Sequence, residues 1–135
     1  MSTNARRLVI TILVAHGAFH LFGIAKAFGW AEVEELKEPI SEWLGVVWLA
    51  AALLLFAAAA ALMFRIGWWW VAAAAGAVLS QAVMVASWTD TEVGTFVNVA
   101  IALAVVYSSI VERHARTPHH ELVSSPGSSP PALSS

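Results

Sequence analysis

Residues 43–64 read WLGVVWLAAALLLFAAAAALMF, a run of 22 residues that contains no charged side chain. A helix of this length is about 33 Å long, which is enough to cross a hydrocarbon layer about 30 Å thick. Hydrocarbon offers no hydrogen-bond partner to backbone N–H and C=O groups, so a chain that crosses it must satisfy them internally, as a helix does. The abundance of Ala and Leu favours the same conformation. This stretch is therefore predicted to be a transmembrane helix.

Three further apolar runs of similar length occupy residues 8–30, 68–88 and 93–111. Of the 135 residues, 59% are hydrophobic and 12% are charged, and the mean hydropathy is +0.74. A soluble domain of this size could not bury so much apolar surface, which indicates that a bilayer surrounds much of the chain. The connections are short, which favours antiparallel neighbours. We predict an all-α fold, an integral membrane four-helix antiparallel bundle, formed by one domain of residues 1–116.

Local signals indicate where some helices begin and end. Residues 4–7, Asn-Ala-Arg-Arg, and the apolar run after them resemble a signal peptide, but the run is longer than the apolar region of a usual signal sequence and no small-residue cleavage site follows it. We therefore expect the first run to remain as a helix. Residues 65–67, Arg-Ile-Gly, predict a tight turn. Residues 89–92 read TDTE, a capping box with Thr89 at the N-cap that would begin the fourth helix.

The basic residues are divided unequally between the two ends of the predicted bundle. Five of the seven lie on the side of both termini: Arg6, Arg7, Arg65, Arg113 and Arg116. Lys26 and Lys37 lie toward the other side, where the connection 31–42 also holds most of the acidic residues. The positive-inside rule then predicts that both termini are cytoplasmic. Tryptophans at 30, 43 and 88 and at 68–70 are expected to mark the two interfaces.

Residues 117–135 differ from the rest of the chain in composition. They are rich in Ser and Pro and have few apolar side chains to bury, so we expect a disordered cytoplasmic tail. The net charge of −2 gives no indication of nucleic-acid binding. The chain has no cysteine, which removes disulfides, thiolate metal ligands and cysteine nucleophiles.

Polar residues inside the predicted helices point to a possible site in the outer half of the bundle. The candidates are His16, His20, Lys26, Glu42, Ser80, Gln81 and Asn98. The two histidines are four positions apart and therefore lie on one face of a helix. Polar groups that face hydrocarbon are costly, so we expect these side chains to turn inward and meet.

Three roles fit His16 and His20. In the first, they are neutral imidazoles that bond to Ser80, Gln81 or Asn98 and position the helices. In the second, these groups line a pocket for a quinone, a lipid or another amphipathic molecule. In the third, the two histidines bind a metal ion or haem, which their spacing suits. For this third role no other strong ligand is evident at that depth.

Three segments resemble known membrane proteins. Residues 16–29, HGAFHLFGIAKAFG, resemble the helix-one signature of DoxX-like proteins, in which a face of small residues leads into a G-x-x-K element. Residues 39–49, PISEWLGVVWL, and 79–98, LSQAVMVASWTDTEVGTFVN, resemble the membrane region of a bacterial family of unknown function. In longer members of that family a soluble domain follows the four helices, whereas here a Ser/Pro-rich segment follows them.

The resemblance covers about residues 8–111 and implies a four-helix bundle in the bacterial inner (plasma) membrane. For DoxX itself it implies an association with quinone-linked sulfur oxidation, a role that does not extend to the whole group. The missing soluble domain puts in doubt any activity that resided there.

The expected function is that of an accessory or binding module whose outer-half pocket holds a lipid or a quinone. The alternatives are a histidine-ligated metal or haem redox subunit and a purely structural partner in a larger membrane complex. The expected partners are membrane lipids and a second membrane protein or a second copy of this chain. No catalytic residue or substrate is indicated.

The orientation can be tested with reporter fusions. If both termini are cytoplasmic, alkaline phosphatase fused to the C-terminus will be inactive, because that enzyme matures only outside the cytoplasm. A fluorescent protein fused at the same place will be bright. Active phosphatase together with a dark fluorescent protein would mean that the chain inserts the other way round.

Overall fold

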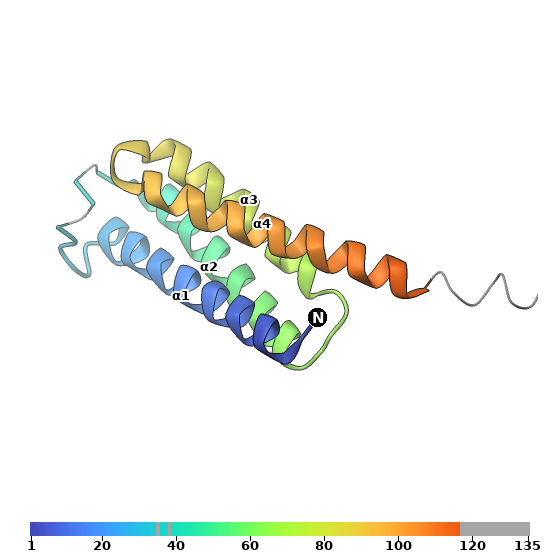
Figure 1. Ribbon diagram of the computed structural model, residues 1–135. Helices are drawn as coiled ribbons and strands as arrows, with labels where there is room; N and C mark the ends of the chain where they lie inside the picture. The colour runs from blue at the N-terminus through green and yellow to red at the C-terminus, as the bar shows by residue number, and fades with distance from the viewer. Residues whose placement is uncertain (35, 38, 117–135) are drawn as a thin grey trace, which may run out of the picture.

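The computed structural model describes residues 1–34, 36–37 and 39–116, with the backbone alone described at 88–90, 92, 109 and 112–116. Four helices follow one another along the chain: α1 (Thr3–Ala27), α2 (Glu42–Met63), α3 (Trp69–Ala86) and α4 (Trp88–Arg116). The described residues contain no strand. The prediction of an all-α antiparallel four-helix bundle is confirmed (Figure 1). The predicted tail, residues 117–135, lies outside the described residues.

The surface of the bundle is suited to hydrocarbon. Helices α1, α2 and α3 are each long and apolar enough to cross a membrane, and α4 adds the apolar segment Val93–Ser108. Large apolar side chains such as Phe19, Leu53 and Phe96 are exposed on the outside. Water would make such a surface unfavourable, whereas lipid chains match it. The chain is therefore a membrane protein.

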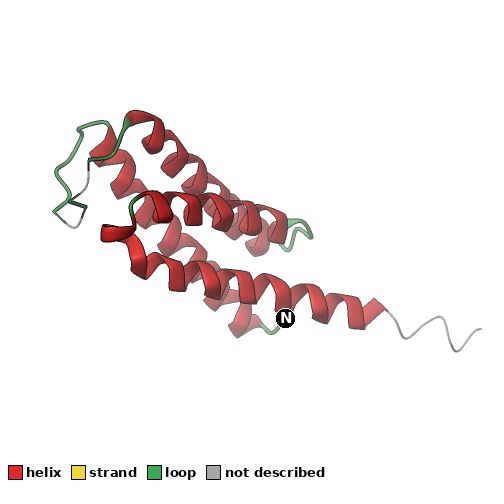
Figure 2. Ribbon diagram, turned by 90° about the horizontal axis from the view of Figure 1, so that it is seen from above, coloured by secondary structure: helices red, strands yellow, loops and turns green. Residues whose placement is uncertain are grey.

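Helices that are neighbours in the sequence are also neighbours in space. Helix α1 packs along α2, α2 along α3, and α3 along α4. Helices α1 and α4, which would close the ring, meet far less closely than the other adjacent pairs. Figure 1 shows the N-terminus at the same end as the α2–α3 turn, and Figure 2 shows α4 extending beyond the other helices there. The α1–α4 seam is thus the loosest side of the bundle.

Helix α1 begins and ends earlier than the apolar run 8–30 predicts. It begins at Thr3 because the Ser2 hydroxyl accepts a hydrogen bond from the Ala5 N–H at 3.2 Å. It ends at Ala27 because Gly29 adopts a left-handed conformation (φ 65°), which lets the Trp30 N–H donate to the Ala25 carbonyl at 2.8 Å.

Helix α2 ends in the same way, but with an arginine at the left-handed position. The Ile66 N–H donates to the Ala61 carbonyl at 2.7 Å, and Arg65 has φ 59°. A side chain with a Cβ atom in this conformation is less stable than glycine there by about 1–2 kcal/mol. The predicted turn at residues 65–67 is therefore present, and it carries local strain.

The predicted capping box is wrong as the beginning of α4. The helix begins at Trp88, so Thr89 lies inside its first turn, and Ser87 alone separates α3 from α4. The connection is instead stabilised by Thr91, whose hydroxyl donates to the Ser87 carbonyl at 2.7 Å and to the Met84 carbonyl at 3.1 Å. The Met84 carbonyl belongs to the last turn of α3, where helical partners are lacking.

The close contact between α1 and α2 depends on glycines, which have no side chain. A Cβ atom added at Gly23 would collide with the Trp48 ring, and one added at Gly45 would collide with Ala27. These glycines let the two helices approach closely enough for Trp48 to be buried beneath α1.

We predict that Gly23→Val lowers the free energy of unfolding by about 1–3 kcal/mol, because the new side chain overlaps Trp48 in a packed interface. Ala18→Val is the matched control, since residue 18 is on the same helix but exposed. Unfolding in mixed micelles of mild detergent and dodecyl sulfate measures both. Equal stability of the two variants would show that Gly23 is not in a tight contact.

Candidate functional site

Both histidines of α1 are buried, and both contact one hydroxyl group on α3. His16 and His20 are 3% and 1% exposed. The Nε2 atom of His16 lies 3.0 Å from Ser80 Oγ, and the Nε2 atom of His20 lies 2.9 Å from the same oxygen. The two rings meet edge to face with their centroids 5.1 Å apart. Ser80 therefore joins α1 to α3 through two hydrogen bonds.

The same network continues into α4. His16 Nε2 also lies 3.0 Å from the Asn98 Oδ1 atom. Asn98 Nδ2 donates to Gln81 Oε1 at 3.1 Å, and Gln81 Nε2 donates to Thr95 Oγ1 at 3.2 Å. Five of the seven predicted site residues, His16, His20, Ser80, Gln81 and Asn98, thus belong to one hydrogen-bonded network across three helices.

The network sets the tautomers of neutral histidines. Asn98 Oδ1 can only accept, so the ring nitrogen of His16 that faces it, Nε2, carries the proton. If this N–H is shared with Ser80 Oγ, the Ser80 hydroxyl is free to donate to His20 Nε2. The proton of His20 is then on Nδ1. In this arrangement donation runs from His16 to Asn98 and from Ser80 to His20.

Two polar atoms beside this network have no partner among the described residues. They are His20 Nδ1 and Trp48 Nε1, both buried. The two rings are in contact, with centroids 5.0 Å apart and planes at 64°. Trp48 Nε1 always carries a hydrogen, and His20 Nδ1 carries one when Ser80 donates to His20 Nε2, so in that tautomer two N–H donors are unsatisfied at one place. A buried donor without an acceptor costs about 1–3 kcal/mol, which makes this pair a candidate for ligand contact.

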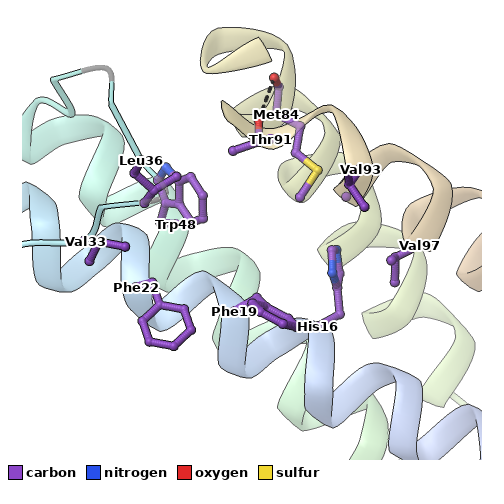
Figure 3. A pocket seen from close by; sticks show the side chains of 11 residues that line it. His16, Phe19, Phe22, Val33, Leu36, Trp48, Met84, Thr91, Val93 and Val97 are labelled. Carbon is purple, nitrogen blue, oxygen red and sulfur yellow. Dashed lines mark hydrogen bonds between the residues drawn. The ribbon is translucent and has the colours of Figure 1, made fainter. Parts of the chain in front are cut away.

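A cavity of about 560 Å³ lies beside these residues, between α1 and α4. Its lining is mostly apolar, with Phe19, Phe22, Val33, Leu36, Met84, Val93, Gly94 and Val97, and it includes His16, Trp48 and Thr91. Figure 3 shows the His16 ring pointing away from α1 into the space toward Met84 and Val97, with Trp48 and Leu36 at the far end. Its size is within the range of pockets for small molecules, about 300–1,000 Å³.

The cavity reaches the outer surface of the bundle. Phe19 of α1 and Val93 of α4 both line it, yet they are 64% and 70% exposed. It therefore opens sideways through the α1–α4 seam, where these helices meet least closely. At one end it is covered by Leu36 of the α1–α2 connection, which is buried against Ile24, Trp48 and Val83.

Two predicted site residues are not joined to the network. Lys26, in the last turn of α1, is half-buried, and Glu42, the first residue of α2, is exposed. No described hydrogen bond connects either side chain to His16, His20 or their partners. Both lie at the end of the bundle that carries the α1–α2 connection, which is why their positions in the sequence suggested proximity to the site.

The prediction missed Trp48 and Thr95. Trp48 lies inside an apolar run, away from the interfaces where tryptophans were expected. This unusual position in the sequence could have indicated that its indole N–H belongs to a buried site. Thr95 lies three residues before Asn98 and so on the same face of α4.

Two histidines on one helix face can also act as metal ligands. Within the described part of the chain, no group of three or more His, Cys, Asp or Glu side chains is close enough to hold a metal ion. The Nε2 atoms of His16 and His20 converge on the Ser80 hydroxyl at 2.9–3.0 Å. Metal–nitrogen bonds are about 2.0–2.1 Å for zinc, so a shared ion would have to displace this hydroxyl and draw the rings inward.

No protein-family model, curated protein or solved structure matches this chain.

We predict that Ser80→Ala lowers the free energy of unfolding by about 1–2 kcal/mol, because it removes two interhelical hydrogen bonds and leaves His20 Nε2 without a partner. The matched control is Ser108→Ala. Ser108 is also a buried helical serine, but its hydroxyl donates to the Ala104 carbonyl of its own helix at 2.8 Å and has only a long contact, 3.8 Å, with Met1 Sδ. Detergent unfolding of both variants gives the comparison, and equal losses would mean that the network contributes no stability.

Proposed function

We propose that this protein is a membrane-embedded binding module that holds a quinone or a lipid in the cavity between α1 and α4. The observation that carries the proposal is the cavity itself, which is large, mostly apolar and lined at one end by Trp48, whose Nε1 donor has no partner among the described residues. Pockets for amphipathic molecules combine such an apolar lining with a few polar groups that fix the orientation of the ligand.

The polar side of the site suits a ligand that carries a hydrogen-bond acceptor. Trp48 lines the cavity, and its Nε1 donor has no described partner. The neighbouring His20 does not line the cavity but contacts the Trp48 ring, with centroids 5.0 Å apart, and so positions this donor. A carbonyl or ester oxygen of a quinone or lipid could accept from Trp48 Nε1 after a small rotation of the indole ring, which would remove the desolvation penalty of the donor.

The route of entry follows from the lateral opening. The exposed rim residues Phe19, Phe22 and Val93 would contact lipid chains, so a hydrophobic ligand can reach the cavity from within the bilayer. A hydrocarbon tail could remain in the seam between α1 and α4 while the polar head lies near His16 and Trp48. This arrangement requires no passage through water.

We further propose the cellular setting that the sequence suggests. The basic residues favour cytoplasmic termini, and the resemblance to DoxX-like proteins favours the bacterial inner membrane. In that setting the ligand would be supplied by the membrane pool. A second membrane protein, or a second copy of this chain, would be the partner that uses it.

A structural role is the second candidate, and one observation favours it. The Nε2 atoms of both histidines are bonded to Ser80, and His16 also to Asn98, so much of the polar network is satisfied without any ligand. A redox subunit with a histidine-bound metal or haem is the third candidate. It is included in the test below because the Nε2 atoms of His16 and His20 point to the same place.

We predict that filling the cavity displaces the ligand. In Val97→Trp the indole would occupy the space next to His16, whereas Val99→Trp is a matched control because residue 99 is exposed on the same helix. Protein purified in mild detergent is extracted with organic solvent, and the quinones and lipids recovered per chain are measured by mass spectrometry. We expect Val97→Trp to retain about tenfold less of one species, a loss of about 1.4 kcal/mol in binding. Equal recovery from both variants would contradict the proposal.

His20→Ala separates the three roles. In the binding role it depletes the co-purifying species, in addition to the stability lost with its hydrogen bond to Ser80. In the structural role it lowers the free energy of unfolding by about 0.5–2 kcal/mol and changes no bound molecule. In the metal or haem role both His20→Ala and His16→Ala lower the metal content or abolish a haem absorption band in the optical spectrum.

A further inference from the structure

A second, smaller cavity lies at the opposite end of the bundle. Its volume is about 170 Å³, and residues from all four helices and from the α2–α3 turn line it. Figure 1 shows that the N-terminus and the α2–α3 turn meet at this end. The site is therefore remote from the cavity beside His16 and shares no lining residue with it.

The lining of this cavity is cationic. It includes Arg6 of α1 and Arg65 of the α2–α3 turn, and no Asp or Glu is among its described lining residues. Trp69 and Tyr107 add an indole and a phenol, of which Trp69 is buried and Tyr107 exposed. Guanidinium groups present planar, paired donors that match the oxygens of a phosphate group, and they keep their charge at any physiological pH.

The backbone supports a role for Arg65 beyond ending a helix. Helices α1 and α2 end in the same hydrogen-bonded motif, with Gly29 and Arg65 respectively at the left-handed position. Glycine fits that position without strain, so the arginine is held in an unfavourable conformation at the mouth of a cavity. Retained strain of this kind is found where a side chain is positioned for binding.

We propose that this cavity binds a phosphate group between Arg6 and Arg65, carried by an anionic phospholipid or by a dissolved phosphate ion. Basic pockets between transmembrane helices at the membrane surface take lipid headgroups in this way. The exposed Tyr107 is an amphipathic side chain of the kind that lies at the headgroup level. Because the two cavities are separate, this site does not depend on the function proposed above.

The test uses the full chain in mild detergent, titrated with phosphatidylglycerol and, separately, with phosphatidylcholine of the same acyl chains, with bound lipid counted by native mass spectrometry. We expect one phosphatidylglycerol per chain to bind in preference to phosphatidylcholine. Arg6→Gln should weaken this binding about 5–10-fold. Arg7→Gln is the matched control, because residue 7 is the next position on α1, loses the same charge and does not line the cavity.

Arg65→Gly shows whether a loss of lipid binding arises from a loss of folding. It relieves the left-handed strain, so its thermal unfolding temperature should equal or exceed that of the original chain while phosphatidylglycerol binding falls about 5–10-fold. Inorganic phosphate is then added as a competitor. Displacement of the lipid identifies a dissolved anion as a ligand of the site, and failure to displace it identifies the lipid headgroup.

Two results would overturn the proposal. One is a loss of binding in Arg7→Gln as large as in Arg6→Gln, which would mean a diffuse attraction to the whole charged surface. The other is binding of phosphatidylglycerol that is unchanged in both Arg6→Gln and Arg65→Gly.

Discussion

A buried imidazole, amide or hydroxyl in hydrocarbon has no water to bond with, and this constraint determines how the four helices are held together. The hydrogen bonds that Ser80 shares with His16 and His20, and the bond between His16 and Asn98, connect α1 to α3 and α4. They do so although α1 and α4 pack against each other only loosely. Polar bonds thus hold the bundle together at the place where close apolar packing is missing.

The space left at that seam is the main cavity. If α1 and α4 were packed as tightly as α1 and α2, the cavity beside His16 would be closed. Two of the residues that line it differ in how well their hydrogen bonds are satisfied: His16 has partners in Ser80 and Asn98, whereas Trp48 Nε1 has none among the described residues. A mostly apolar lining with a few polar groups is common in pockets for small molecules. The arginine-lined cavity at the other end would fix the bundle against the membrane surface.

The sequence predicted the helices and most of the polar network, but not how the residues meet. Four apolar runs of transmembrane length specified the bundle, because hydrocarbon allows few alternatives. The expectation that His16, His20, Ser80, Gln81 and Asn98 lie inside followed from the cost of exposing them to lipid. Sequence could not show that Ser80 would be shared by both histidines, because this depends on the rotation of α3 about its axis. The left-handed ends of α1 and α2 were also missed, since Gly29 and Arg65 lie within or beside hydrophobic sequence. Likewise, the capping box was misplaced because Ser87 alone is enough to reverse the chain.

The most direct test of the account follows the indole proton of Trp48. In micelles of mild detergent without added lipid, the tryptophan indole N–H signals are recorded by nuclear magnetic resonance, and Trp48→Phe identifies the signal of residue 48. The account predicts that a short-chain quinone or a diacyl lipid admitted to the cavity shifts this signal, because the unsatisfied donor gains an acceptor. The signals of Trp30 and Trp43, which are exposed, should stay in place. A Trp48 signal that does not move with either ligand, or that moves only as much as those of Trp30 and Trp43, would contradict the account.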